Sequence, residues 1–284
     1  MFINIRGGLL DLDHPRVMGI INVTGDSFYE GSRYESIGDV IKAAGIMTGD
    51  GADIIDVGGC STRPGAVEIP EDEEKKKVCN AVEAIRSHYP DAIISVDTYR
   101  SSVAEAAVCS AGADIINDIS GGEMDDRMFR LVERLNVPYI MMHMQGTPQT
   151  MQKSPHYENV VSDLLSWFSV RIAALHQAGV KDIIIDPGFG FGKNPDHNFE
   201  MLRRLDEFRI VALPLLVGLS RKSMIWKTLE ITPADSLAGT AALNMTALMN
   251  GASILRVHDV KEARQVVTLF EKIYPQGTLF DHNC

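Results

Sequence analysis

The sequence has few cysteines and no apolar stretch long enough to cross a membrane. Its 4 cysteines among 284 residues (Cys60, Cys79, Cys109 and Cys284) are scattered and form no Cys-x-x-Cys pair. This pattern excludes a zinc-ribbon protein and a small disulfide-stabilised secreted fold. A membrane-spanning helix needs about 18 consecutive apolar residues, and the N-terminus lacks the features of a secretory signal peptide. We therefore expect a cytoplasmic protein with no membrane partner.

Positive charge is also scarce, since 27 Lys and Arg residues face 38 Asp and Glu residues and the formal net charge is −11. Surfaces that bind nucleic acids are basic because they contact phosphates, so we expect no nucleic-acid partner. An anionic small-molecule substrate would require a local group of cations that overcomes the negative field of the whole protein.

Short runs of Ile, Val, Leu and Met alternate along the chain with segments of helical periodicity. The runs are continuous rather than alternating, which is typical of parallel strands buried on both faces. The predicted strands are 17–22, 53–57, 93–97, 115–118, 139–143, 183–186, 215–218 and 254–258. The predicted helices are 37–50, 71–89, 102–111, 126–135, 160–178, 198–208, 234–250 and 260–274.

Eight such βα units without a Ser-, Gly- or Pro-rich linker predict one α/β domain over residues 1–284, a closed (β/α)8 TIM barrel. A doubly wound open sheet is the alternative. Its dinucleotide-binding form is disfavoured because no Gly-x-Gly-x-x-Gly motif follows the first strand. The Gly-rich segment 188–193 ends in Lys but lacks the spacing of a P-loop.

Polar side chains occur at the carboxyl end of nearly every predicted strand, before a loop rich in Gly, Ser or Thr. These strand-end residues are Asn22, Asp56, Asp97, Asn117, Asp118, His143, Asp186, Ser220, Arg256 and His258. In a TIM barrel the carboxyl ends of the strands meet at one face, where such enzymes have their active sites. The pattern therefore predicts an active site at this mouth of the barrel.

Cations among these loops indicate an anion site. Arg256 and His258 alternate along the last strand and so point to the same side of it. The segment 220–223 (Ser-Arg-Lys-Ser) opens a helix whose backbone N–H groups would face the mouth; a Ser cap with solvated cations is the alternative. Arg63 offers a guanidinium suited to phosphate, or is a surface loop charge.

Three fixed acceptor groups suggest what the mouth binds. Asp97, Asn117 and Asp186 would suit a flat heterocycle with several N–H donors, such as an aminopyrimidine. Lys222 would then donate to a ring carbonyl or ring nitrogen. The alternative for any one carboxylate or amide is that it satisfies neighbouring backbone groups.

Two other patterns have a structural interpretation. The charged run 71–77 predicts a solvated helix face. The Met-rich run 141–144 predicts core residues, with one face lining the pocket.

Several ordered motifs together resemble the dihydropteroate synthase family over essentially the whole chain. They are MGIINVTGDSF (18–28), DVGGCSTRPGA (56–66), SVDTYR (95–100), NDISGG (117–122), MHMQGTP (142–148), DPGFGFGKN (186–194), LVGLSRKSMI (216–225) and RVHDV (256–260). The resemblance implies a transferase of folate biosynthesis, usually a homodimeric TIM barrel and a sulfonamide target. The implied reaction joins (7,8-dihydropterin-6-yl)methyl diphosphate to 4-aminobenzoate, giving 7,8-dihydropteroate and diphosphate by an SN1-like displacement.

The resemblance also implies a role for each matching residue. The pterin site would comprise Asp97, Asn117, Asp186, Lys222, Met141 and Gly218. The diphosphate would be held with Mg²⁺ by Asn22, Thr62, Arg63, Arg256 and His258, with Asn22 as the one protein ligand of the metal. The 4-aminobenzoate site would comprise Phe28, Pro64, Phe191, Lys222 and Ser223. The implied catalytic residues are Asp97, Lys222 and Arg63.

Two positions depart from the usual family motifs. Gly25 stands where Pro is common, which raises the entropic cost of ordering that loop by roughly 0.4–1 kcal/mol. Cys60 stands where Glu is common and removes a negative charge beside Arg63. Both departures bear on rate and 4-aminobenzoate affinity rather than on pterin recognition.

Two other functions compete with this interpretation. A pterin-binding barrel that passes a methyl group to a corrinoid protein shares the strand-end Asp and Asn residues, but has no need of the Ser-Thr-Arg-Pro-Gly and Ser-Arg-Lys-Ser segments. A degenerate relative would bind pterin without turnover, and only Gly25 and Cys60 point that way.

Overall fold

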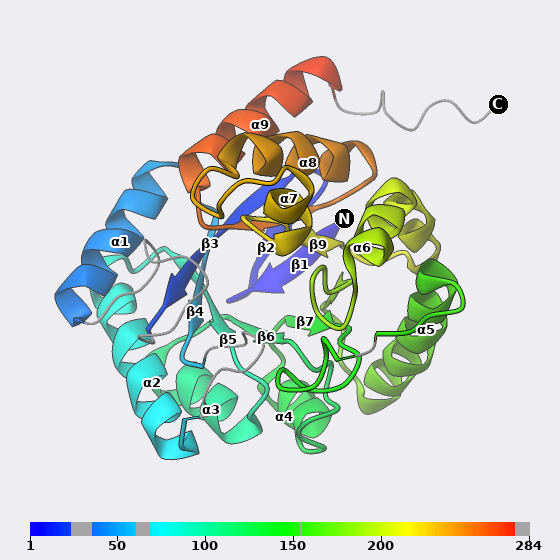
Figure 1. Cartoon of the computed structure of the whole chain (residues 1–284). Helices are drawn as coiled ribbons and strands as arrows, with labels where there is room; N and C mark the ends of the chain where they lie inside the picture. The colour runs from blue at the N-terminus through cyan, green and yellow to red at the C-terminus, as the bar shows by residue number, and fades with distance from the viewer. Residues whose placement is uncertain (24–35, 61–68, 154, 276–284) are drawn as a thin grey trace.

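The computed structural model describes residues 1–23, 36–60, 69–153 and 155–275. Its centre is an eight-stranded parallel sheet in the order β8-β7-β6-β5-β4-β3-β10-β9, with helices around the outside (Figure 1). A bridge between Ile185 and Leu215 joins the two ends of the sheet. The predicted single closed TIM barrel is therefore confirmed over the described residues. Among these residues no helix combines the length and the apolar character that a bilayer span requires.

The elements match the predicted segments closely. The barrel strands are β3 (Arg16–Asn22), β4 (Ile54–Gly58), β5 (Ile93–Asp97), β6 (Ile115–Asp118), β7 (Tyr139–Met142), β8 (Ile183–Asp186), β9 (Leu216–Val217) and β10 (Ile254–Val257). The α-helices are α1 (Ile37–Gly49), α2 (Glu71–His88), α3 (Ser101–Ala106), α4 (Met128–Leu135), α5 (Val160–Ala178), α6 (Pro195–Arg203), α7 (Ser223–Thr228), α8 (Leu237–Met249) and α9 (Val260–Ile273). The π-helical turn η2 (Ala107–Ala111) extends α3, and the 3₁₀ helix η3 (Leu205–Val211) follows α6.

An N-terminal hairpin, which the sequence patterns did not predict, closes the amino end of the barrel. It comprises β1 (Phe2–Ile5) and β2 (Gly8–Asp11), paired antiparallel. Ile3, Ile5 and Leu12 are buried against the first inward-facing side chains of the barrel strands. The amino end of the barrel is therefore filled, which leaves the carboxyl end as its open mouth.

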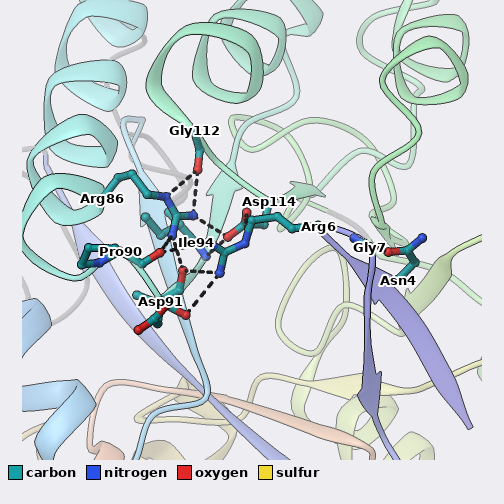
Figure 2. A network of polar contacts seen from close by, with 10 residues as sticks. Asn4, Arg6, Gly7, Arg86, Pro90, Asp91, Ile94, Gly112 and Asp114 are labelled. Atoms are coloured by element: carbon teal, nitrogen blue, oxygen red, sulfur yellow. Dashed lines mark hydrogen bonds and ion pairs between the residues drawn. The ribbon is translucent and has the colours of Figure 1, made fainter.

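Ion pairs to Asp114 fasten the hairpin to the barrel (Figure 2). Asp114 lies just before β6, is 5% exposed, and accepts from Arg86 Nη2 at 2.7 Å and from the backbone N–H of Ile94 at 2.8 Å. Arg6, in the hairpin turn, lies 3.3 Å from the same carboxylate and also donates to the Pro90 carbonyl at 2.9 Å. One buried carboxylate thus links the hairpin, α2 and the sheet.

The period-two alternation of the strands brings the polar residues to the barrel axis. Ile54, Ile115, Ile184 and Ile254 form the apolar layer next to the hairpin. Two positions further along the same strands are Asp56, Asn117, Asp186 and Arg256. These four side chains therefore share the interior of the barrel, one layer nearer the mouth.

Candidate active site

Arg256 of β10 is the centre of the polar layer. Its Nε donates to Asp56 Oδ2 at 2.7 Å, and its Nη2 donates to Asp97 Oδ2 at 2.6 Å. Asn117 Nδ2 donates to the same Asp56 oxygen at 3.1 Å. Side chains from β4, β5, β6 and β10 therefore meet in one hydrogen-bonded cluster, as the strand-end pattern predicted.

The charges of this cluster shift its pKa values. Burial raises the pKa of Asp97 to about 7; Arg256 opposes the shift, and Asp56 adds to it. Burial works against the Arg256 cation, but Asp56 and Asp97 together hold the pKa of Arg256 above its ordinary value. Asp56 is fully buried, and its Oδ1 accepts no hydrogen bond from any described residue. The sequence marked Asp56 only as a strand end, and its role in holding Arg256 became clear from the structure.

Lys222 reaches the mouth from the segment before α7. Its Nζ contacts the Phe189 carbonyl and lies 4.9 Å from the centre of the Phe191 ring. Burial lowers the pKa of Lys222 to about 8, while the Asp186 charge opposes the shift. Asp186 accepts from the Gly188 backbone N–H at 2.7 Å, and burial raises its pKa. The structure thus places Phe191 beside the Lys222 ammonium.

Glycines leave room between these side chains. A Cβ built on Gly218 would lie 3.7 Å from Lys222 Nζ and 3.9 Å from Arg256 Cβ, so Gly218 lies beside the Lys222 ammonium and the base of the Arg256 side chain. A Cβ on Gly58 would lie 3.4 Å from Asn22 Oδ1 and 3.5 Å from Asp97 Cβ. Asn22 of β3 and Asp97 of β5 therefore flank Gly58 of the intervening strand β4.

The segment 220–223 opens a helix, as predicted, but its cations separate. α7 begins at the exposed Ser223. Arg221 is buried, pairs with Asp259 through two contacts of 2.8 Å, and donates to the Ala234 carbonyl at 2.6 Å. His258 Nδ1 lies 3.1 Å from Ser220 Oγ, so the predicted diphosphate residue His258 lies beside the start of this segment. Of the cations Arg221 and Lys222, it is Lys222 that faces the mouth of the barrel.

Comparisons with known proteins show which family the chain resembles. Residues 18–258 match a family model described as pterin binding enzyme. The chain is 46% identical over 268 residues to dihydropteroate synthase from Escherichia coli strain K12, covering 94% of each chain. The Bacillus subtilis dihydropteroate synthase is 39% identical over 263 residues, which cover 92% of this chain and 89% of that one.

The chain belongs to the dihydropteroate synthase family.

Solved structures of the dihydropteroate synthase family share the fold. The Yersinia pestis dihydropteroate synthase in a sulfonamide drug complex is 40% identical, with a TM-score of 0.91, and the match covers 96% of this chain and 98% of that one. The Thermus thermophilus dihydropteroate synthase in complex with 4-aminobenzoate is 36% identical, with a TM-score of 0.86, over 96% and 100% of the two chains.

Two expectations about this family member were wrong. Met141 is not at the mouth: it is fully buried between the barrel and the helices, because adjacent residues of a strand point to opposite faces. Its neighbour Met142 instead packs in the cluster that includes Phe191. Glu74 is not solvated like much of the charged run around it, since it is fully buried and accepts from Thr98 Oγ1 and Arg100 Nη1 at 2.7 Å each.

Five residues named for the dihydropteroate synthase loops lie outside the described residues. They are Gly25, Phe28, Thr62, Arg63 and Pro64. Their predicted roles therefore remain predictions. Cys60, the last described residue before 61–68, accepts a backbone hydrogen bond from Ile69, and burial and the nearby Glu74 raise its pKa.

Proposed function

We propose that this protein condenses (7,8-dihydropterin-6-yl)methyl diphosphate with 4-aminobenzoate to form 7,8-dihydropteroate, as a dihydropteroate synthase of folate biosynthesis. The observation that carries the proposal is the convergence of Asp97, Asn117, Arg256 and Lys222 in the barrel of a chain that belongs to this family. A structure of a dihydropteroate synthase with product supports the same chemistry in a relative that is 40% identical.

The pterin ring takes the polar layer of the barrel. Asp97, Asn117 and Asp186 accept hydrogen bonds from the ring N–H groups, and the Asn117 amide orients against Asp56. Lys222 donates to the ring carbonyl or a ring nitrogen. Gly218 leaves space for the flat ring between Lys222 and Arg256, because a side chain there would contact both.

Charge stabilisation supplies most of the catalysis. Breaking the bond between the pterin methylene carbon and the diphosphate oxygen leaves a cation delocalised into the ring, which the Asp97 carboxylate stabilises. The diphosphate takes the bonding electrons and is held by Asn22, Arg256 and His258, together with Thr62 and Arg63. The Nε and Nη2 of Arg256 already bind carboxylates, so its Nη1 is the edge that faces an anion.

Mg²⁺ fits this site only as a partner of the substrate. Among the described residues no group of three or more His, Cys, Asp or Glu side chains is arranged to hold a metal ion. The carboxylates of Asp56 and Asp97 are bound to Arg256. Asn22 can supply one oxygen, and Mg²⁺ usually retains waters and binds substrate phosphates. When bound, the ion would neutralise part of the charge of the leaving diphosphate.

The second substrate, 4-aminobenzoate, binds nearer the mouth of the barrel than the pterin. Its neutral aromatic amine attacks the pterin methylene carbon and then loses a proton to solvent. Phe191 and Lys222 form one wall of this space. The carboxylate of 4-aminobenzoate lies at Ser223, the exposed first residue of α7. Phe28 and Pro64 complete the site, and sulfonamides compete there because they resemble 4-aminobenzoate.

Two further properties accompany the proposal. We expect a homodimer, supported by the exposed apolar residues Leu269 and Ile273 of α9 and Ile210 of η3. We also expect action in the cytoplasm, because Cys79 and Cys109 are free thiols, as is usual in a reducing compartment.

Turnover by the purified protein tests the reaction. With the pterin diphosphate and Mg²⁺, diphosphate release that depends on 4-aminobenzoate and is matched mole for mole by dihydropteroate is expected. Pterin binding without any release would favour the degenerate or the methyl-transfer alternative. Removing Mg²⁺ with a chelator should lower the rate without unfolding the protein, because the metal enters with the substrate.

A further inference from the structure

The segment 188–192, between β8 and α6, has each of its backbone carbonyls bound by a side chain. Lys193 Nζ donates to the carbonyls of Gly188 (3.1 Å) and Phe191 (3.0 Å), and Lys222 Nζ donates to that of Phe189. Gln152 Nε2 donates to the Gly190 carbonyl at 2.7 Å, and the Tyr157 hydroxyl donates to that of Gly192 at 2.8 Å. The conformation of this segment is thus fixed by donors outside it.

Lys193 is the most buried of these donors, at 2% exposure, and it is not among the proposed substrate ligands. Besides the two carbonyls, its Nζ lies 3.0 Å from His143 Nδ1 at the end of β7. Burial and the Lys193 charge lower the pKa of His143 to about 2, so the imidazole is neutral and its Nδ1 accepts. Lys193 therefore ties the segment after β8 to the end of the adjacent strand.

The backbone at Gly188 shows how closely the segment approaches β7. Its φ is +71°, and a Cβ there would lie 2.0 Å from the His143 carbonyl oxygen. Only glycine permits both this conformation and this contact. The segment is therefore held against β7, with the Lys193 Nζ between them.

Lys222 depends on the same segment from its other side. The Phe189 carbonyl and the Phe191 ring are its two contacts there. Lys193 donates to the carbonyl of Gly188, the residue directly before Phe189, and to the carbonyl of Phe191. A shift of this segment would therefore move both groups that orient the Lys222 ammonium.

We propose that Lys193 is a positioning residue for the reaction: by holding the Gly188 and Phe191 carbonyls against His143, it fixes the groups that direct Lys222 toward the pterin. The inference rests on the proposed function, because it takes Lys222 as a pterin ligand. Lys193 itself does not touch the substrate. Any effect of Lys193 on substrate affinity must therefore depend on the presence of Lys222. A residue that only stabilised the fold would lower the affinity whether or not Lys222 were present.

A double-mutant cycle measures this dependence. The Kd of the pterin diphosphate with Mg²⁺ is determined by calorimetry for the wild type, Lys193→Met, Lys222→Met and the double variant. We expect Lys193→Met to raise Kd about tenfold in the wild-type background and less than about twofold in the Lys222→Met background. Lys227→Met, at an exposed lysine of α7, is the matched control and should leave Kd unchanged.

Equal fold-changes in the two backgrounds, or an unchanged Kd for Lys193→Met, would overturn the inference. A wild type that binds no pterin diphosphate would instead overturn the proposed function, so the two failures are distinguishable. If Lys193→Met lacks a native circular-dichroism spectrum, Tyr157→Phe replaces it in the cycle. That variant removes only the hydroxyl that donates to the Gly192 carbonyl, and the same dependence on Lys222 is expected at a smaller fold-change.

Discussion

Asp97 and Lys222 are two residues whose ionisation should shape the pH dependence of the enzyme. The pKa of Asp97 is raised to about 7, so the carboxylate is lost as the pH falls through that value. The pKa of Lys222 is lowered to about 8, so the ammonium is lost as the pH rises through that value. Both charged forms are needed to bind the pterin and to stabilise the developing cation.

We therefore expect kcat/KM for the pterin substrate to be bell-shaped, with its maximum between these two values. Initial rates between about pH 5.5 and 9.5 measure the profile. Lys222→Arg should remove the alkaline limb, because a guanidinium stays charged throughout this range. A profile that stays flat in both proteins would show that neither group titrates in the working site.

Asp56 is a second residue with a predictable effect. Its Oδ2 accepts from both Arg256 and Asn117, so replacing the carboxylate by an amide removes a charge-assisted bond at the centre of the polar layer. We expect Asp56→Asn to lower kcat/KM between about tenfold and a hundredfold, as for the loss of a hydrogen bond to a charged group. Steady-state kinetics with a circular-dichroism check of folding measure this. An unchanged kcat/KM would refute the role of Asp56 in holding Arg256.

For individual residues, the sequence predicted which side chains belong to the site better than it predicted their contacts. Asp97, Asn117, Asp186 and Arg256 were found as strand ends, and the period-two alternation of strands brings them to one interior. Arg256 of β10 pairs with Asp56 of β4 and Asp97 of β5, which are not its neighbours in the sheet. These contacts therefore depend on the stagger of strands that lie far apart in sequence. Arg63 was predicted as a phosphate ligand from its guanidinium and from the family resemblance, and it lies outside the described residues.

Among the elements, the N-terminal hairpin shows why a short local pattern can escape detection. Its strands have four residues each, too few to establish a period. Its turn is Arg6-Gly7, both at positive φ, and not the Asn-Gly or Asp-Gly that usually identifies a two-residue hairpin turn. The barrel strands, several of them no longer, were found because they are continuous Ile, Val, Leu and Met runs that alternate regularly with amphipathic helices.

The hairpin should stabilise the barrel without taking part in catalysis. Ile3 is 2% exposed against the first layer of the barrel interior, whereas Leu9 of the same hairpin is 73% exposed. We expect Ile3→Ala to lower the free energy of unfolding by about 2–4 kcal/mol. Urea denaturation measures this change, with Leu9→Ala as the matched control that should leave it unaltered. Equal effects of the two substitutions would show that the hairpin is not packed into the barrel.

For the whole molecule, the expected homodimer is the property most accessible to experiment. Leu269 and Ile273 of α9 are 58% and 59% exposed, and α9 packs beside α8 on the outside of the barrel (Figure 1). Apolar side chains of this kind are typical of the core of a dimer interface. We expect sedimentation velocity to give a dimer for the wild type and a monomer for Leu269→Glu/Ile273→Glu. A monomeric wild type at micromolar concentration would contradict the assignment.

The protein carries a net charge of −11, which repels an anionic substrate. The substrate must therefore be attracted by a few local cations, so it should bind where these cations lie. Both Lys222 and Arg256 lie at the carboxyl end of the barrel, and the hairpin fills the amino end. We therefore expect the pterin diphosphate to bind at the carboxyl end of the barrel.

Two carboxylates at opposite ends of β8 test that placement most directly. Asp186 ends the strand at the mouth, whereas Asp182 precedes its first residue and accepts from the Asn4 backbone in the hairpin. Calorimetric titration of the pterin diphosphate should show Kd raised about tenfold or more by Asp186→Asn, as expected when a charged acceptor is lost, and unchanged by Asp182→Asn. Wild-type affinity in Asp186→Asn, or an equal loss in both variants, would contradict a pterin site at the mouth of the barrel.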